Sequence, residues 1–222
     1  MKRILSLAIA TVMTTFAAQA TIYTTNWSNA LNPLTPFANG GIVPDNSYSG
    51  WSDSREISGQ SGTITPGSLQ VQLNLSGGWN GDLYAYLVNS SGGFAVLLDR
   101  VGYPASTYGY GNSGFDIALT TSGNPIESYQ NFSPTYNLSG QLQGTWQWQS
   151  NPVAFLNPNG TWSLFIADLN GGDVTTVQSW GLQMDIVAVP EVESWIAAAL
   201  AGAFGAFWLN RQIWGSKGAQ QV

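Results

Sequence analysis

The chain has 222 residues, with 12 acidic and 6 basic side chains, no histidine and no cysteine. Without an imidazole or a thiol it cannot form a Ser-His-Asp or Cys-His catalytic site or the usual zinc centres, and no Gly-Lys-Ser/Thr sequence of a P-loop occurs. The acidic composition leaves no basic surface for a phosphate backbone, which excludes nucleic-acid binding, and we expect a protein that is not an enzyme.

The first twenty residues have the pattern of a secretory signal peptide. Two basic residues are followed by an apolar run over residues 4–16, and Ala18 and Ala20 form an A-x-A cleavage site. We therefore predict that residues 1–20 are removed and that the mature chain lies outside the cytoplasm. Because an exported chain without cysteine has no disulfides, its stability must come from packing.

Residues 21–188, called the body here, are predicted to form one β domain. The body carries ten acidic and two basic residues, a net charge of −8. Apolar and polar residues alternate with a period of two over residues 69–75, 83–87, 162–166 and 180–186. Shorter apolar or aromatic runs cover residues 94–98, 115–119 and 143–149. Clusters rich in Gly, Asn and Pro separate these runs, so the pattern predicts an all-β, jelly-roll-like two-sheet β-sandwich after a loose lead-in over residues 21–39.

Residues 195–209 contain no charged side chain and are predicted to form a short transmembrane helix. The run is short for a hydrocarbon core of about 30 Å, which needs about 20 helical residues. Val189, Pro190 and Glu191 precede the run, and Arg211 follows it, where a basic residue would stay on the cytoplasmic side. A marginal span between a turn motif and a basic residue favours a processing signal over a permanent anchor.

This arrangement resembles the PEP-CTERM sorting tail of exported bacterial proteins, in which a Pro-Glu-Pro motif precedes a short hydrophobic helix and an Arg-rich end. The resemblance implies that residues 189–222 are a sorting tail and that an exosortase-type enzyme cuts near Glu191. Two positions depart from the family pattern: Val192 replaces the second proline, and Arg211 alone follows the helix directly. The alternative is an ordinary single-span anchor.

The body resembles the P domain, also called the P/Homo B domain, of subtilisin-like proprotein convertases. The matching segments occur in the family's order at residues 42–45, 69–75, 79–83, 97–100, 115–116, 157–164, 168, 172–173 and 179–182. Val174-Thr175 departs from the family's Thr-Gly pair. The resemblance implies a β-sandwich that packs against a protease domain and stabilises it, while the protease domain carries the chemistry.

Oxygen-rich turns suggest one kind of ligand site. Asp168, Asn170 and Asp173 lie within six residues of each other on a predicted turn, where extracellular β domains often bind calcium. Asp45, Asp53 and Asp82 could lie nearby at the same end of the sandwich. The alternative is that Asp, Asn and Gly are present because they form turns. No spacing selects two acids as a pair for glycoside hydrolysis.

Aromatic residues suggest a second kind of site. Trp79 lies in a Gly/Asn turn, and a Gly-rich loop carries Tyr103, Tyr108 and Tyr110. Trp146 and Trp148 lie on one face of a predicted strand, either in the core or as an exposed platform. Exposed rings suit sugar stacking or a protein partner, whereas rings folded onto the sandwich would be structural.

Together these patterns predict an exported, non-catalytic structural or interaction module. It would pass through a form tethered in the inner membrane and then reach the cell surface, envelope or extracellular matrix. A carbohydrate-binding module for exopolysaccharide is one alternative, and an accessory domain to a separate peptidase is another. No cofactor is expected apart from the calcium ion considered above.

Overall fold

The computed structural model describes residues 19–188, Leu200 and residues 202–205. The predicted processing residues Ala18, Val189, Pro190, Glu191 and Arg211 lie outside the described residues. Of the predicted membrane helix at 195–209, Leu200 and residues 202–205 are helical, and the remainder lies outside the described residues. No helix among the described residues has the length and apolar character needed to cross a membrane.

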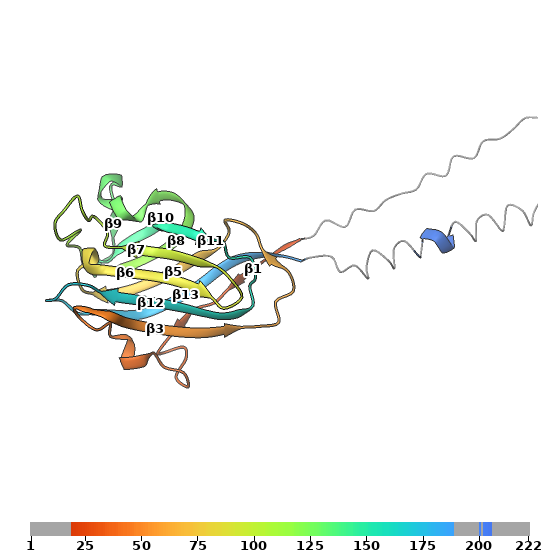
Figure 1. The fold of residues 1–222 in the computed structure, drawn as a ribbon, viewed down its shortest axis with the longest axis horizontal. Coiled ribbons are helices and arrows are strands. Elements are labelled where there is room, and N and C mark those ends of the chain that lie inside the picture. The colour runs from red at the N-terminus through yellow and green to blue at the C-terminus, as the bar shows by residue number, and fades with distance from the viewer. Residues whose placement is uncertain (1–18, 189–199, 201, 206–222) are drawn as a thin grey trace, which may run out of the picture. The chain divides into compact units, whose positions relative to one another are not determined.

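The body is a sandwich of two β-sheets (Figure 1). In the larger sheet the strand order is β1-β13-β5-β8-β10-β9, and the short strands β2 and β4 also pair with β13. These strands are β1 (Ala20–Thr24), β2 (Trp27–Ser28), β4 (Thr63–Ile64), β5 (Gln70–Gly77), β8 (Phe115–Pro125), β9 (Thr135–Tyr136), β10 (Leu142–Gln147) and β13 (Thr175–Val187).

The smaller sheet has the order β11-β7-β6-β12-β3. Its strands are β3 (Ser47–Ile57), β6 (Leu83–Asn89), β7 (Phe94–Asp99), β11 (Ser150–Val153) and β12 (Gly160–Asp168). Three short 3₁₀ helices complete the described body: η1 (Ala38–Gly41), η2 (Asn80–Asp82) and η3 (Ile126–Phe132). Successive strands pass between the sheets several times, and the predicted two-sheet sandwich is confirmed.

All seven predicted strands are present, with ends that differ by a few residues from the sequence prediction. Their partners are antiparallel with one exception among the described pairs, because β10 runs parallel to β8. The sequence pattern did not predict that parallel pair, since a period of two is the same in both kinds of sheet.

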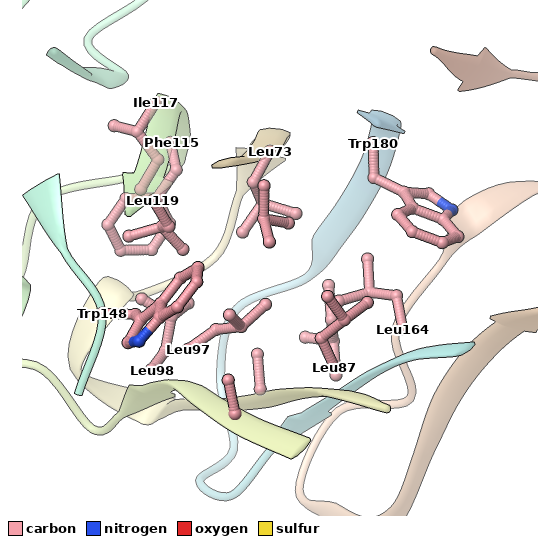
Figure 2. Packing of buried hydrophobic residues seen from close by; sticks show 14 of the residues in the cluster. Leu73, Leu87, Leu97, Leu98, Phe115, Ile117, Leu119, Trp148, Leu164 and Trp180 are labelled. Carbon is pink, nitrogen blue, oxygen red and sulfur yellow. The ribbon is translucent and has the colours of Figure 1, made fainter. Parts of the chain in front are cut away.

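The core lies between the two sheets, where the alternating apolar faces meet. Figure 2 shows Leu73 and Leu119 on one side and Leu87, Leu97 and Leu164 on the other. All five are fully buried or nearly so. Burying a side chain of this size contributes about 1.5–3 kcal/mol, which is how a chain without disulfides holds this fold.

The predicted loose lead-in is wrong, because the first described residues belong to the larger sheet. Each residue of β1 pairs with a residue of β13, from Ala20 with Val187 to Thr24 with Gln183. Trp27 then packs on Trp180 with 4.4 Å between ring centroids. An edge strand is held by backbone hydrogen bonds, so β1 needs no alternating apolar pattern and gave no signal in the sequence.

Strand β3 was also missed, because charged residues interrupt the apolar pattern of its inward face. Trp51 and Ile57 are buried from this strand, and so is Arg55, which is 8% exposed. The Arg55 Nε donates to Asp53 Oδ2 at 2.7 Å, and its terminal nitrogens donate to Thr35. From sequence alone, an arginine flanked by polar residues is not expected in a core. Arg55 is buried here because its guanidinium group donates hydrogen bonds to Asp53 and Thr35.

Candidate functional site

Three loops meet at one end of the sandwich. They are the β5–β6 connection that contains η2, the β7–β8 loop, and the turn between β12 and β13. The register brings them together: Thr175 pairs with Gly77, and Asp168 pairs with Leu83. The loops enclose a hollow of about 260 Å³, called the end pocket here, lined by Trp79, Asp82, Tyr108, Asn170, Gly171 and Asp173. Residues from both predicted site classes therefore line one pocket.

The aromatic side of the end pocket is held by close backbone contacts. The Trp79 indole nitrogen donates to the Tyr108 carbonyl oxygen at 2.9 Å, and a Cβ on Gly111 would lie 2.6 Å from the indole ring. The Gly81 backbone N–H donates to the Tyr110 carbonyl at 2.9 Å. Trp79 is 36% exposed and Tyr108 is 63% exposed, so fixed rings border an open hollow.

The acidic side of the pocket contains a buried carboxylate, Asp82, one oxygen of which lacks a hydrogen-bond partner. Asp82 is 5% exposed, and among the described residues nothing hydrogen-bonds to its buried Oδ1. The Arg100 Nη2 lies 3.8 Å from that oxygen, beyond hydrogen-bonding distance. Burial raises the pKa of Asp82 despite a hydrogen bond from the Asn170 side chain and the nearby Arg100, and the neighbouring carboxylates of Asp173 and Asp45 raise it further.

Asp168 lies deeper, behind the pocket turn. It is 1% exposed, and its Oδ1 accepts a hydrogen bond from the Asn170 backbone N–H at 3.3 Å. Burial raises the pKa of Asp168 to about 6, with smaller contributions from the nearby carboxylates of Asp82, Asp45 and Asp173. The turn thus gathers negative charge at the end of the sandwich.

The residues named for a possible calcium site lie at different depths in the structure. Within the part of the chain that the structure describes, no three acidic side chains converge where a metal ion could bind. Asp168 is buried by the turn, while Asn170 and Asp173 border the pocket. Asp53 lies elsewhere and accepts from Arg55 and from the Trp180 indole.

The structure resolves the alternatives for the other aromatic residues. Trp146 and Trp148, left open between core and platform, are core: they are 6% and 3% exposed, and Figure 2 shows Trp148 among core leucines. Tyr110 packs on Tyr129 with 4.8 Å between centroids. Tyr103 is 50% exposed and supports the Arg100 guanidinium, whose central carbon lies 4.6 Å from the ring centroid. Only Trp79 and Tyr108 of the six candidates line the end pocket.

Sequence reasoning did not single out Asp82 as the link between the two groups. Its position in the Gly81-Asp82-Leu83 segment marked a strand start, but its unpartnered oxygen depends on packing. A period of two predicts the face on which a strand residue lies, but it does not predict which groups form hydrogen bonds to a carboxylate in a loop.

A second hollow, of about 390 Å³, lies on the outer face of the larger sheet. Its lining is mostly polar and comes from Thr24, Thr25, Asn26, Gln72, Leu73, Asn74, Asp116, Ile117, Ser179 and Gln183. Asp116 already accepts hydrogen bonds from the amides of Asn74 and Gln143. None of the residues that line this hollow is aromatic, so it offers hydrogen bonds without a stacking surface.

We expect Asp168→Asn to remove part of the pH dependence of stability. Because the folded pKa, about 6, exceeds the unfolded value, 3.8, the native state binds more protons between these values. The contribution of Asp168 to the free energy of unfolding should therefore fall by about 2 kcal/mol as pH rises from 4 to 6, and change little above, on the basis of about 1.4 kcal/mol per pKa unit. The variant should lack this fall.

The measurement is urea unfolding at pH 4, 5, 6 and 7 with a chelator present. Glu127 serves as the internal reference, because burial raises its pKa to about 7 and its contribution persists in both proteins. An unchanged pH profile in the variant would show that Asp168 does not titrate in this range.

Comparison with known proteins gives a family match. The model of the proprotein convertase P-domain matches residues 66–184, more than half of the chain. Among solved structures, the serine protease of Aeromonas sobria is similar at 13% identity and a TM-score of 0.42, covering 79% of this chain and 28% of that one. The complex of that protease with the chaperone ORF2 gives 15% identity and a TM-score of 0.43, covering 77% and 28%.

The chain thus spans 28% of the length of each Aeromonas chain. No curated protein matches the sequence.

Proposed function

The chain belongs to the proprotein convertase P-domain family, and from this membership we propose that it is an exported, non-catalytic interaction module. The observation that carries the proposal is the end pocket, where the exposed rings of Trp79 and Tyr108 border a hollow. Exposed aromatic residues beside a concave surface are typical of binding sites, and this chain has neither histidine nor cysteine for catalysis.

The expectation that the chain is not an enzyme comes from the same composition. A P domain beside a protease contributes stability and contacts, while nucleophile, base and acid come from the protease domain. In this chain no imidazole exists to activate a hydroxyl as a nucleophile. A role as an accessory domain to a separate peptidase agrees with the same features and is a variant of this proposal.

We base the export part of the proposal on the two ends of the sequence. The signal peptide at residues 1–20 would direct the chain out of the cytoplasm. The sorting tail at 189–222 would hold it in the inner membrane through the helix at 195–209 until an exosortase-type enzyme cuts near Glu191. The body would then reside at the cell surface, in the envelope or in the extracellular matrix.

Intact mass of the mature protein tests this processing. We expect it to lack residues 1–20 and everything after about Glu191. A Glu191→Ala variant should retain the tail and remain in the membrane fraction, whereas a Glu56→Gln variant, changed on the exposed face of β3, should be processed normally. A mature wild-type protein that keeps residues 195–209 would make the tail an ordinary anchor.

A carbohydrate-binding module is the second candidate function. The polar hollow on the larger sheet favours it, because amides such as Gln72 and Gln183 can bond to sugar hydroxyls. Burial of Trp146 and Trp148 weighs against it, since those rings cannot stack on a sugar. Retention of the protein on exopolysaccharide, lost in a Gln183→Ala variant at this hollow or in a Trp79→Ala variant at the end pocket, would favour this function over a protein partner.

A further inference from the structure

The end pocket combines aromatic rings with carboxylates. Trp79 and Tyr108 form one part of its lining, and Asp82 and Asp173 form another. We propose that this pocket binds the guanidinium group of an arginine side chain presented by a partner protein. The inference rests on the proposed role as an interaction module and names the chemistry of its partner.

Negative charge is in excess around the pocket, which favours binding of a cation. Asp82 and Asp168 are both almost fully buried, and Asp45 and Asp173 lie close enough to raise the pKa values of both. Among the described residues, Arg100 is the cation paired with this group, and its Nη2 stays 3.8 Å from Asp82 Oδ1. A buried carboxylate oxygen without a hydrogen bond is costly, so a donor that enters the pocket relieves that cost.

The pocket suits an organic cation better than a metal ion. Its acidic groups are spread around the hollow and do not meet at one point. A metal ion needs short bonds to several oxygens at once, whereas a guanidinium group spreads its charge over five N–H donors in one plane. The hollow of about 260 Å³ is also bordered by rings, which offer a metal ion no ligand.

Each of the two arginines of the body already lies beside both an aromatic ring and a carboxylate. Arg100 lies over the Tyr103 ring at 4.6 Å and beside Asp82. Arg55 lies over the Phe37 ring at 5.6 Å, and its Nε donates to Asp53 at 2.7 Å. Each pairs a ring face with a carboxylate.

The end pocket repeats that pairing with Trp79 and Asp173, and no arginine of the described chain lines it. Tryptophan is the strongest aromatic partner for a cation, and a guanidinium stacks on a ring more readily than an ammonium does. The net charge of −8 on the body would also attract a basic partner over longer distances.

The experiment measures binding of blocked tripeptides to the full chain, purified in a mild detergent. The probes are Gly-Arg-Gly and the same peptide with citrulline, which keeps the shape of arginine and removes its charge. Indole N–H resonances report on Trp79, assigned with a Trp79→Phe variant. We expect the arginine peptide to shift the Trp79 signal with a dissociation constant of about 1 mM, as befits one anchoring group, and the citrulline peptide to leave it unchanged.

Two variants test the carboxylate and the ring. Asp173→Asn and Tyr108→Ala change exposed side chains, so both proteins should fold, and each should weaken arginine binding about tenfold, equivalent to about 1.4 kcal/mol. Glu56→Gln and Tyr48→Ala, which change an exposed acid and an exposed ring on β3, should leave binding unchanged.

Several outcomes would overturn the inference. Equal binding of the citrulline peptide, or arginine binding that is insensitive to Asp173→Asn, would show that no ring-and-carboxylate site exists. A Trp79 shift produced by calcium alone or by a neutral or amino-sugar oligosaccharide, with none from arginine, would assign the pocket to another ligand. In each case normal removal of the two chain ends would leave the export part of the proposed function standing.

Discussion

Replacing Trp180 with alanine is expected to lower the free energy of unfolding by about 4 kcal/mol, the range found for buried Trp→Ala changes. Trp180 is fully buried, and Trp27 packs on it at 4.4 Å. Its indole nitrogen donates to Asp53 Oδ2 at 2.7 Å, and the same oxygen accepts from Arg55 Nε. Alanine would leave a cavity and would take one donor from a buried ion pair.

Urea unfolding followed by fluorescence measures this loss, with Trp180→Phe to separate its two parts. Phenylalanine keeps most of the ring and lacks the N–H, so it should cost about 2 kcal/mol, near the value of a hydrogen bond to a charged group. Tyr48→Ala, at an exposed ring, should change stability by less than about 0.5 kcal/mol. If Trp180→Phe costs as much as Trp180→Ala, the hydrogen bond to Asp53 dominates and cavity formation contributes little.

Gly81→Ala is expected to destabilise the protein by about 3 kcal/mol and to abolish the end pocket. A Cβ at this position would lie 2.6 Å from the Gly109 Cα and 2.7 Å from the Tyr110 backbone nitrogen, and would overlap the Tyr108 carbonyl oxygen. All of these atoms belong to backbone that cannot rotate away. The loop that carries Tyr108 must therefore move, and Trp79 loses the carbonyl that its indole contacts.

Gly171→Ala is the matched control, because Gly171 lines the same pocket with room to spare. A Cβ there would lie 3.5 Å from the nearest Asn46 atom, an ordinary contact. Stability should stay within about 0.5 kcal/mol of wild type, as for other tolerated surface changes. Denaturant midpoints and the Trp79 indole resonance give both readouts, and a Gly81→Ala protein with an unshifted resonance would contradict the close packing of these loops.

The sequence predicted the central strands well, because their inward faces are strictly apolar. The alternation over residues 180–186, for example, identified β13 and its buried face. It failed for β1, an edge strand held by backbone pairing, and for β3, whose inward face includes the paired Arg55. Both strands depend on partners more than 100 residues away, which local pattern does not report.

The candidate site was only partly predictable, for a related reason. Composition identified Trp79, Tyr108, Asn170 and Asp173 as separate candidates, each on a turn. Their meeting at one pocket follows from strand order, which fixes which loops share an end of the sandwich. The two-residue spacing of Trp146 and Trp148 places them on one face of a strand. It does not show whether that face is covered by the other sheet or exposed to solvent.

Strand β13 also separates the end pocket from the two ends of the body. The strand starts at Thr175, next to the pocket loops, and ends at Val187, which pairs with Ala20. Thirteen residues at about 3.3 Å each put roughly 40 Å between these points. The end pocket therefore lies at the opposite end of the sandwich from Ala20 and Val187, so a partner bound there would leave both ends of the body free.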